Sequence, residues 1–447
     1  MTPTPPLARP GLRAGALLGA GLALLLALAP RAAADVLTVG PAGAHAGIQD
    51  AVDAAADGDV ILVASGEYAA VTITNKALTV VADTGALVQV RGGLVVQSLS
   101  PGRNVVLRGL EVDNFSSTGP FLAGLSLFFN QGSLRVETCR FEGNSQLFTL
   151  GANTPGARVL GCSDAAFRDC VFVGGNGGSG GLAGAPGSPG LDVEGSEVTL
   201  HGGEVHGGVG AFGGNGPTGS VDEAQGNRGG PALRLRDASL FASGVPMLGG
   251  SGGGGGTCGG AVTEPGDGGS GGHAVELMGA SALFRNQRCE LEGGPGGPGG
   301  DARFPLCLSS GSAGPDGEVL LEGGGLHLTV PGTPRGFDAL MPQRENVPFG
   351  VALEGLPGEF VALLNSPAIG TSYEPGAQGQ LLLSTLFDLE LVGVVPPSGT
   401  LAFATSFPSL GPGVEGLTLF VQSLFVDGNG QLTLGPGLAP VVVDASF

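Results

Sequence analysis

The fold is decided by the stretch Cys139-Arg140-Phe141-Glu142-Gly143 and by its return as Cys170-Val171-Phe172-Val173-Gly174. In both copies an apolar residue, a spacer, a second apolar residue and another spacer precede glycine. The first apolar position is filled in all copies by Leu110, Cys139, Cys170, Gly203, Val245, Cys289 and Val319. Successive copies are separated by steps of 29 to 44 residues. A fixed motif with connections of variable length indicates a solenoid, in which every turn adds an alternating strand.

The second apolar position of the motif predicts a row of inward-facing side chains. Its members are Val112, Phe141, Phe172, Val205, Met247, Leu291 and Leu321. Because side chains alternate between the two faces of a strand, we expect this row to point into the core and the spacers to point outward.

Residues 1–34 have the features of a secretory signal peptide. Arg9 and Arg13 precede an apolar run over 14–29, and alanines at 32–34 form a cleavage site before Asp35. No later stretch reaches about 18 unbroken apolar residues, so we expect no membrane span in the mature chain. These features predict a secreted protein that is extracellular, at the cell surface or in the periplasm.

Composition narrows the choice of partners. The chain has 447 residues and a net charge of −20, with 19 Lys and Arg against 39 Asp and Glu. Nucleic acid is therefore not expected as a partner. The absence of Trp and the presence of only 2 Tyr leave few rings on which sugars stack.

The segment after Ala46 predicts a short helix that covers one end of the solenoid. Apolar residues at 48, 51, 52 and 55 fall on one helical face that ends at Asp57-Gly58, and strands are expected at 60–63, 71–73 and 78–81. Such a helix protects the terminal strands from pairing with other chains.

The runs Ile48–Asp59, Gly66–Tyr68 and Lys76–Val80 resemble the N-terminal end of right-handed parallel β-helix proteins of the pectin-lyase-like superfamily. The resemblance implies an all-β fold with three short parallel strands in each turn, stacked about 4.8 Å apart. It covers residues 35–100 by motif and extends to about 330 through the repeat, so we place the β-helix domain at 35–330.

Long glycine-rich connections follow four copies of the motif, at 174–190, 207–230, 249–272 and 293–317. They should leave the β-helix at the same corner, because each follows the same position of the motif. Their three-residue glycine period is that of polyproline II helices, which bundle where glycine lets backbones approach. The alternative is a set of flexible spacers.

Composition changes beyond residue 330. We interpret 331–347 as a linker and 348–447 as a smaller antiparallel β-sandwich. Its predicted strands are 349–353, 360–364, 381–386, 389–395, 401–405, 417–426, 431–434 and 441–443. Asp427-Gly428-Asn429-Gly430 is typical of a hairpin turn, since the further carboxylates of a calcium loop are missing.

Enzymes of this fold act on acidic polysaccharides, but their motifs are not matched. The esterase element Gly-x-Tyr-x-Glu is followed from Gly66 through Tyr68, and Ala70 then replaces the glutamate. The arginine-tryptophan signature is impossible in a chain without Trp, and the glycosidase elements Asn-Thr-Asp and Gly-His-Gly are absent.

Two groups of residues remain as candidate sites, and each also has a purely structural explanation. Asp113, Glu142 and Asp169 are the catalytic candidates, and Glu111, Asp113 and Glu137 are candidate Ca²⁺ ligands on the same predicted carboxylate stripe. Solvated outer faces carry such charges in any case, and we favour this explanation of the stripe. His201, Glu204 and His206 share one repeat, but their spacing suits no zinc signature.

Cysteines raise the question of disulfides in a secreted chain. Cys139 and Cys170 should stack in adjacent turns as free thiols, while Cys258 and Cys307 in consecutive glycine-rich loops are the disulfide candidates. Cys162 has no evident partner.

The sequence favours a non-catalytic β-helix that acts as a structural or interaction element at the bacterial cell surface, with polysaccharide or cell-surface proteins as partners. No cofactor is expected, Ca²⁺ excepted. The alternatives are a calcium-assisted polysaccharide lyase or glycoside hydrolase, and a carbohydrate-binding module, since a fold does not fix a function.

Overall fold

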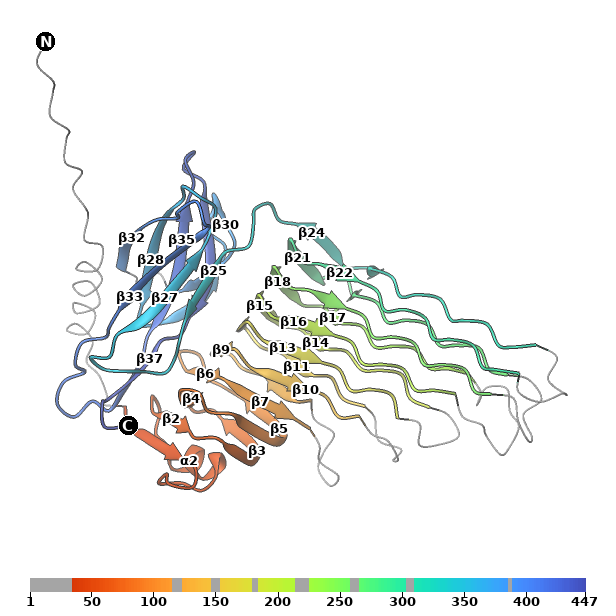
Figure 1. Cartoon of the computed structure of the whole chain (residues 1–447), viewed down its shortest axis with the longest axis horizontal. Coiled ribbons are helices and arrows are strands. Elements are labelled where there is room, and N and C mark those ends of the chain that lie inside the picture. The colour runs from red at the N-terminus through yellow and green to blue at the C-terminus, as the bar shows by residue number, and fades with distance from the viewer. Residues whose placement is uncertain are drawn as a thin grey trace, which may run out of the picture.

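The computed structural model describes residues 34–114, 123–145, 153–178, 184–213, 225–257, 265–302, 309–384 and 388–447. A parallel β-helix forms one part of the molecule, and a smaller β-sandwich packs along its side (Figure 1). The predicted signal peptide lies outside the described residues, except for Ala34. No helix in the described ranges is long and apolar enough to cross a membrane.

One long parallel sheet, which we call sheet 1, runs along the β-helix. In spatial order its strands are β1 (Val36–Val39), β2 (Val60–Val63), β4 (Leu78–Ala82), β6 (Asn104–Arg108), β9 (Ser133–Glu137), β12 (Asp164–Arg168), β15 (Glu197–His201), β18 (Ser239–Ser243), β21 (Leu283–Gln287) and β24 (Leu326–Thr329).

A second parallel sheet divides into two columns at the long strand β5 (Val88–Gln97), which also pairs with β3 (Gly66–Thr74). The column that we call sheet 2 contains β7 (Leu110–Asp113), β10 (Arg140–Glu142), β13 (Val171–Val173), β16 (Glu204–His206), β19 (Met247–Leu248) and β22 (Leu291–Glu292). Sheet 3 contains β8 (Leu125–Phe128), β11 (Ala157–Leu160), β14 (Leu191–Glu194), β17 (Leu233–Arg236), β20 (Val275–Met278) and β23 (Leu320–Gly323). Three strands in each turn confirm the expected right-handed parallel β-helix.

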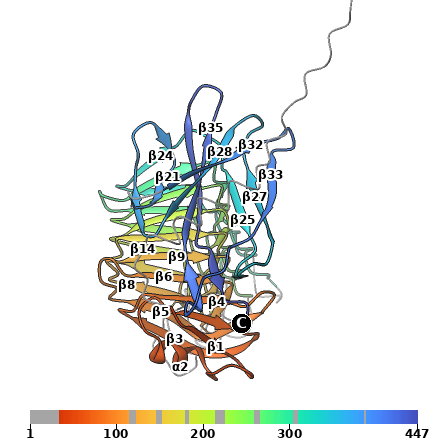
Figure 2. The ribbon, with the colours of Figure 1, turned by 90° about the vertical axis from the view of Figure 1, so that its left-hand side faces the viewer.

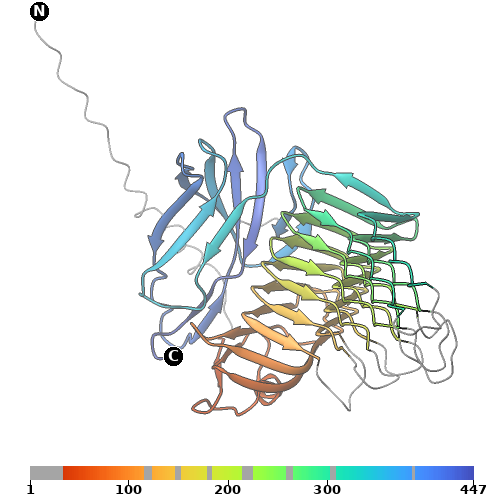
Figure 3. The ribbon, with the colours of Figure 1, turned by 45° about the vertical axis from the view of Figure 1, so that its right-hand side comes forward.

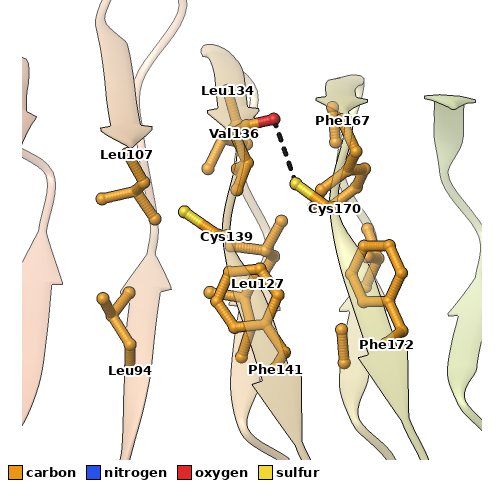
Figure 4. Close-up of a cluster of buried hydrophobic side chains, with 14 of the residues drawn as sticks. Leu94, Leu107, Leu127, Leu134, Val136, Cys139, Phe141, Phe167, Cys170 and Phe172 are labelled. Carbon is orange, nitrogen blue, oxygen red and sulfur yellow. Dashed lines mark hydrogen bonds between the residues drawn. The ribbon is translucent and has the colours of Figure 1, made fainter. Parts of the chain in front are cut away.

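The motif row predicted from the sequence lies in sheet 2. Val112, Phe141, Phe172, Val205, Met247 and Leu291 are register partners in successive turns. Figure 4 shows Phe141 and Phe172 side by side in the core, and their ring centroids are 5.7 Å apart.

The prediction that the last copy of the motif continues this inward-facing row is wrong. Leu321 pairs with Glu276 in sheet 3, and both Val319 and Leu321 are exposed. Leu320 is the residue that packs partly against the core. Strands of sheets 2 and 3 share the same alternation, so the pattern alone could not separate the two columns.

The N-terminal end is covered as predicted. Helix α2 (Ile48–Ala54) buries Ile48, Ala51 and Val52, and it contacts β1, β2 and β3. Gln49 also accepts the backbone N–H of Thr72 at 2.7 Å, which ties the helix to β3.

The glycine-rich connections form an ordered bundle of extended arms (Figures 1 and 3). Each arm leaves the end of a sheet 2 strand and returns to the start of a sheet 3 strand. We call the first halves the outgoing layer (174–178, 207–213, 249–257, 293–302) and the second halves the returning layer (184–190, 225–232, 265–274, 309–319).

Hydrogen bonds join the arms in two directions with a three-residue period. Within the outgoing layer, Gly207 and Gly210 donate to carbonyls of the next turn, Leu248 and Ser251, at 2.9 Å each. Between the layers, Gly230 donates to Gly208 O at 2.7 Å. For the described residues of these connections, the interpretation as a polyproline II-like bundle is therefore confirmed in place of flexible spacers.

Glycine is required where the arms touch. A Cβ on Gly253 would lie 1.8 Å from Ala211 O, and one on Gly296 would lie 1.9 Å from Gly314 O. No heavy atoms approach so closely without bonding, so any side chain would push the arms apart.

Among the described residues, four small sheets of three, three, five and two strands form the sandwich, and most of their strand pairs are antiparallel. Its hydrophobic cluster includes Phe337, Leu353, Val361 and Phe425. The strands are β25 (Gly336–Ala339), β26 (Gln343–Arg344), β27 (Phe349–Glu354), β28 (Phe360–Ser366), β29 (Ile369–Ser372), β30 (Ala377–Gln378), β31 (Leu381–Leu383), β32 (Asp388–Val394), β33 (Thr400–Thr405), β34 (Gly416–Thr418), β35 (Phe420–Val426), β36 (Leu432–Leu438) and β37 (Val441–Val443).

The segment predicted as a linker contributes to this domain, because β25 pairs with β27 and β26 pairs with β37. Asp427 forms the expected turn between β35 and β36, where its Oδ1 accepts the N–H groups of Asn429 and Gln431.

The sandwich covers the outer face of sheet 1 (Figures 1 and 2). Val441 and Val443 pack in one cluster with Val60 and Val81 of the β-helix. Farther along, Arg135 donates to Leu382 O at 3.1 Å. The outer face of sheet 1, which includes part of the carboxylate stripe that we expected to face solvent, is therefore partly a domain interface.

Candidate functional site

The candidate carboxylates do not form one stripe. Glu111, Asp113 and Glu142 lie on the outer face of sheet 2, where Asp113 and Glu142 are register partners. Glu137 ends β9 in sheet 1, and Asp169 occupies the corner after β12. The predicted common surface is wrong, because the chain turns a corner between sheet 1 and sheet 2.

Two of the candidate carboxylates on sheet 2, Asp113 and Glu142, are paired with arginines. Arg91 lies 2.7 Å from Asp113 and 3.1 Å from Glu67, and Arg140 lies 3.6 Å from Glu142. Glu111 lies beside Gln89, with 3.4 Å between its Oε2 and the amide nitrogen. In the described ranges no group of three or more His, Cys, Asp or Glu has the geometry to hold a metal ion.

Glu137 is a buried interface residue rather than a solvent-facing metal ligand. Its Oε2 pairs with Arg108 and lies 3.3 Å from Arg168, and its Oε1 accepts the N–H of Ala439 in the sandwich at 2.7 Å. Only 3% of the residue is exposed. Ion pairs and the backbone donor compensate for the desolvation of its charge, so Glu137 joins the two domains.

Asp169 lies at a cavity of about 330 Å³ between the domains, lined also by Arg168, His201, Asp338 and Glu354. Arg168 contacts Asp169 at 2.5 Å and donates to Phe337 O at 3.2 Å. Asp169, one of the three catalytic candidates, therefore lies in a cavity between the two domains.

The electrostatics of this interdomain cleft favour neutral forms of its acid and its imidazole. Burial raises the pKa of Asp169, and the nearby Asp338 acts in the same direction while Arg168 opposes it. Burial, aided by Arg168, lowers the pKa of His201 to about 4. The shifts favour the protonated form of Asp169, compared with a free aspartate, and the neutral form of His201.

A structural role also explains Asp169. It adopts φ +51°, and Thr138, Gly202 and Gly244 have positive φ at the same corner of other turns. Aspartate tolerates this left-handed conformation better than most residues. The left-handed backbone conformation at this corner thus explains an aspartate at position 169 without a catalytic role.

The two candidate histidines, like the candidate carboxylates, lie on different sheets. His201 is buried in sheet 1, whereas His206 lies on sheet 2 and contacts Glu204 at 2.9 Å. They do not form a common site.

Cys139 and Cys170 occur in adjacent turns as free thiols, as expected. Cys170 Sγ donates to Val136 O at 3.4 Å, as the dashed line in Figure 4 marks. Burial raises the pKa of Cys139 to about 12, so its thiol stays protonated. Cys162 is also free, and Cys258 and Cys307 lie outside the described residues.

Sequence reasoning missed a groove of about 500 Å³ where the returning layer meets sheet 3. Its walls carry Asp192 and Arg234 from the sheet and Asn153, Pro189 and Arg228 from the arms. Asp192 is 7% exposed, yet its Oδ1 has no hydrogen-bond partner in the described part of the chain. Burial raises the pKa of Asp192 despite the neighbouring arginines.

The available signal for this groove was the clustering of arginines in an acidic chain. Arg158, Arg234 and Arg236 all lie in sheet 3 strands, and Arg228 joins them through Glu276. Glu276 also lies 2.7 Å from Arg234. The alternation of side chains along a strand is enough to point the three sheet 3 arginines outward. The position of Arg228 beside them depends on the fold, because Arg228 lies in an arm.

No protein-family model matches the chain, and no curated protein sequence matches it. Among solved structures, the PL6 family alginate lyase AlyGC has 16% identity over 64% of this chain and 40% of that chain, with a TM-score of 0.23. The enzymatically active domain of tailspike protein 4 from bacteriophage CBA120 has 10% identity over 86% of this chain and 64% of that chain, with a TM-score of 0.13. The chain therefore spans less than two thirds of either structure.

The strand order and register of the chain itself define its class. It is a parallel β-helix protein with three strands in each turn.

Proposed function

We propose that the chain is a secreted, non-catalytic structural or interaction element at a bacterial cell surface. The glycine bundle is the observation that carries this proposal. Ordering glycine costs more conformational entropy than ordering any other residue. An array of hydrogen-bonded glycine arms is thus suited to a fixed shape that spaces or presents a surface.

The pairing of surface charges supports the same proposal. Arg91 pairs with Asp113 and Arg140 pairs with Glu142 on sheet 2, and Glu137 is buried in the domain interface. These ion pairs act in folding and solubility, although Asp113 Oδ1 has no hydrogen-bond partner in the described part of the chain.

The test is turnover of acidic polysaccharide. The purified mature chain is incubated with alginate or polygalacturonate, with Ca²⁺ or with a chelator, and ultraviolet absorbance and reducing ends are followed. We expect no activity above that of Asp169→Asn. Turnover that Asp169→Asn abolishes and Asp50→Asn retains would contradict the proposal and favour a lyase or hydrolase.

The interdomain cleft is the observation that favours this enzymatic alternative. Asp169 would serve as the proton donor, and Arg168 would hold an anionic substrate group. Arg168 is occupied by Glu137 and Asp169, which weakens that role.

A second candidate function is the binding of a saccharide in the groove beside Asp192. The unpartnered Oδ1 would accept a sugar hydroxyl, and the flat faces of Pro189 and Pro231 line the same groove. Isothermal titration with alginate oligomers and with neutral cello-oligosaccharides tests this function. Asp192→Leu should weaken binding at least about tenfold, because a hydrogen bond to a charged group is lost. Equal affinity of Asp192→Leu and the wild type would exclude the groove.

A further inference from the structure

The last turn of the bundle ends in an open backbone edge. Within each layer the bonds between turns run one way, from an N–H to a carbonyl of the following turn. In the returning layer, Gly268 donates to Ser312 O at 2.8 Å and Gly271 donates to Pro315 O at 2.9 Å. The arm 309–319 receives these bonds, and no later arm follows it.

Three N–H groups of this arm are therefore left at the edge. Ala313, Asp316 and Val319 occupy the donor positions of the three-residue period, and all three residues are exposed. Their N–H groups have no acceptor among the described residues. On the neighbouring outgoing arm, the N–H of Gly296 is held by Asp316 Oδ1 at 2.9 Å. The returning arm is thus the more open of the two.

The bundle itself shows which backbone complements such an edge. An added arm needs carbonyl groups at every third residue, and a residue without an N–H at those positions would leave no further donor to satisfy. Proline meets both conditions, and in the present arms the carbonyls of Pro231, Pro295, Pro298 and Pro315 accept these bonds. A second copy of the same edge would instead place donors against donors.

We propose that the edge formed by Ala313, Asp316 and Val319 binds a proline-rich segment of another protein in the polyproline II conformation. Such a segment repeats every three residues, about 9.3 Å along its axis, and the donors recur with the same three-residue period. It would add one arm to the bundle, as a peptide adds a strand to the edge of a sheet.

Apolar side chains at the root of the edge favour proline rings. Val319 is 51% exposed and Leu321 is 38% exposed, although both are large and apolar. Pro315 is exposed on the same arm. This edge is distinct from the groove and the cleft, and the proposal does not rest on the function proposed above.

Fluorescence anisotropy with labelled decaproline tests the proposal. In Ala313→Pro, the ring removes one N–H and keeps the extended backbone, so we expect affinity to fall roughly threefold to tenfold. Ala313→Pro combined with Val319→Pro should cost more than about tenfold. The matched control Ala313→Ser keeps the N–H and should bind like the wild type.

The control peptide is a labelled Gly-Ser repeat of the same length, which should not bind. Hydrogen exchange of the complex should show slower exchange at Ala313, Asp316 and Val319. No binding of decaproline, or equal affinity of Ala313→Pro and Ala313→Ser, would overturn the proposal.

Discussion

Phe172 shows how one side chain fixes the register of the solenoid. It is 1% exposed, stacks on Phe141 and meets Phe167 edge to face at 5.2 Å. Phe172→Asp should prevent folding, because it loses about 3–5 kcal/mol of packing and also buries an unpaired carboxylate.

Asn176→Asp is the matched control in the adjoining arm. Asn176 is exposed, and its Oδ1 accepts the N–H of Val209 at 2.8 Å, which an aspartate can also do. Circular dichroism and thermal unfolding of both variants provide the measurement. Similar stability of the two variants would contradict the inward row.

His201 should make the stability of the fold depend on pH. The unfolded chain binds a proton at this histidine near pH 6.5, whereas the folded chain does so only near pH 4. Stability from this group is present above pH 6.5, falls as pH drops toward 4, and changes no further below it.

The loss attributable to His201 amounts to roughly 3 kcal/mol at most, since each pKa unit corresponds to about 1.4 kcal/mol. Denaturant unfolding of the wild type and of His201→Leu, at pH 7 and pH 4.5, isolates this contribution from that of the carboxylates. An equal drop in both proteins would show that His201 does not take part.

At the scale of elements, the arms depend on glycine most where a Cβ would meet the backbone of a neighbouring arm. Gly253→Ala should destabilise the bundle, because its Cβ would lie 1.8 Å from Ala211 O. Gly254→Ala in the same arm should be tolerated, since its Cβ would meet only the side chains of Phe212 and Pro298 at 3.0 Å or more.

Thermal unfolding of the two alanine variants distinguishes them. We expect a clear loss of stability for Gly253→Ala and a much smaller one for Gly254→Ala, because a side chain can shift away from the new Cβ more easily than a backbone carbonyl can. Flexible arms would instead give neutral or slightly stabilising changes at both positions, because alanine restricts the unfolded chain.

Local patterns sufficed for the elements that repeat. Alternation predicted the row from Val112 to Leu291, helical spacing predicted α2, and the glycine period predicted the bundle. Alternation failed at Leu321, where strands of two columns look alike.

The candidate sites were less predictable because their partners are distant in the chain. Glu137 is buried by Ala439, and Arg228 reaches Glu276 across 48 residues. A one-dimensional pattern marks such residues as outward but does not reveal which outer face another domain covers.

At the scale of the whole molecule, Glu137 holds the sandwich against sheet 1. Glu137→Ala would leave Arg108 and Arg168 without their buried partner, which typically costs 3–5 kcal/mol, about the effect we expect. Glu142→Ala removes an exposed pair with Arg140 and should cost less than about 1 kcal/mol. Chemical denaturation measures both, and equal losses would contradict the role of Glu137 at the interface.

The central claim is that the glycine arms are an ordered, hydrogen-bonded part of the molecule. Hydrogen–deuterium exchange of the native chain tests it most directly, by comparing peptides covering 249–257 and 265–274 with peptides covering β17 and β18. We predict exchange in the arms that is slowed as in these strands, because their glycine N–H groups are bonded within and between the layers. Exchange as fast as that of an unstructured glycine-rich peptide would contradict the claim.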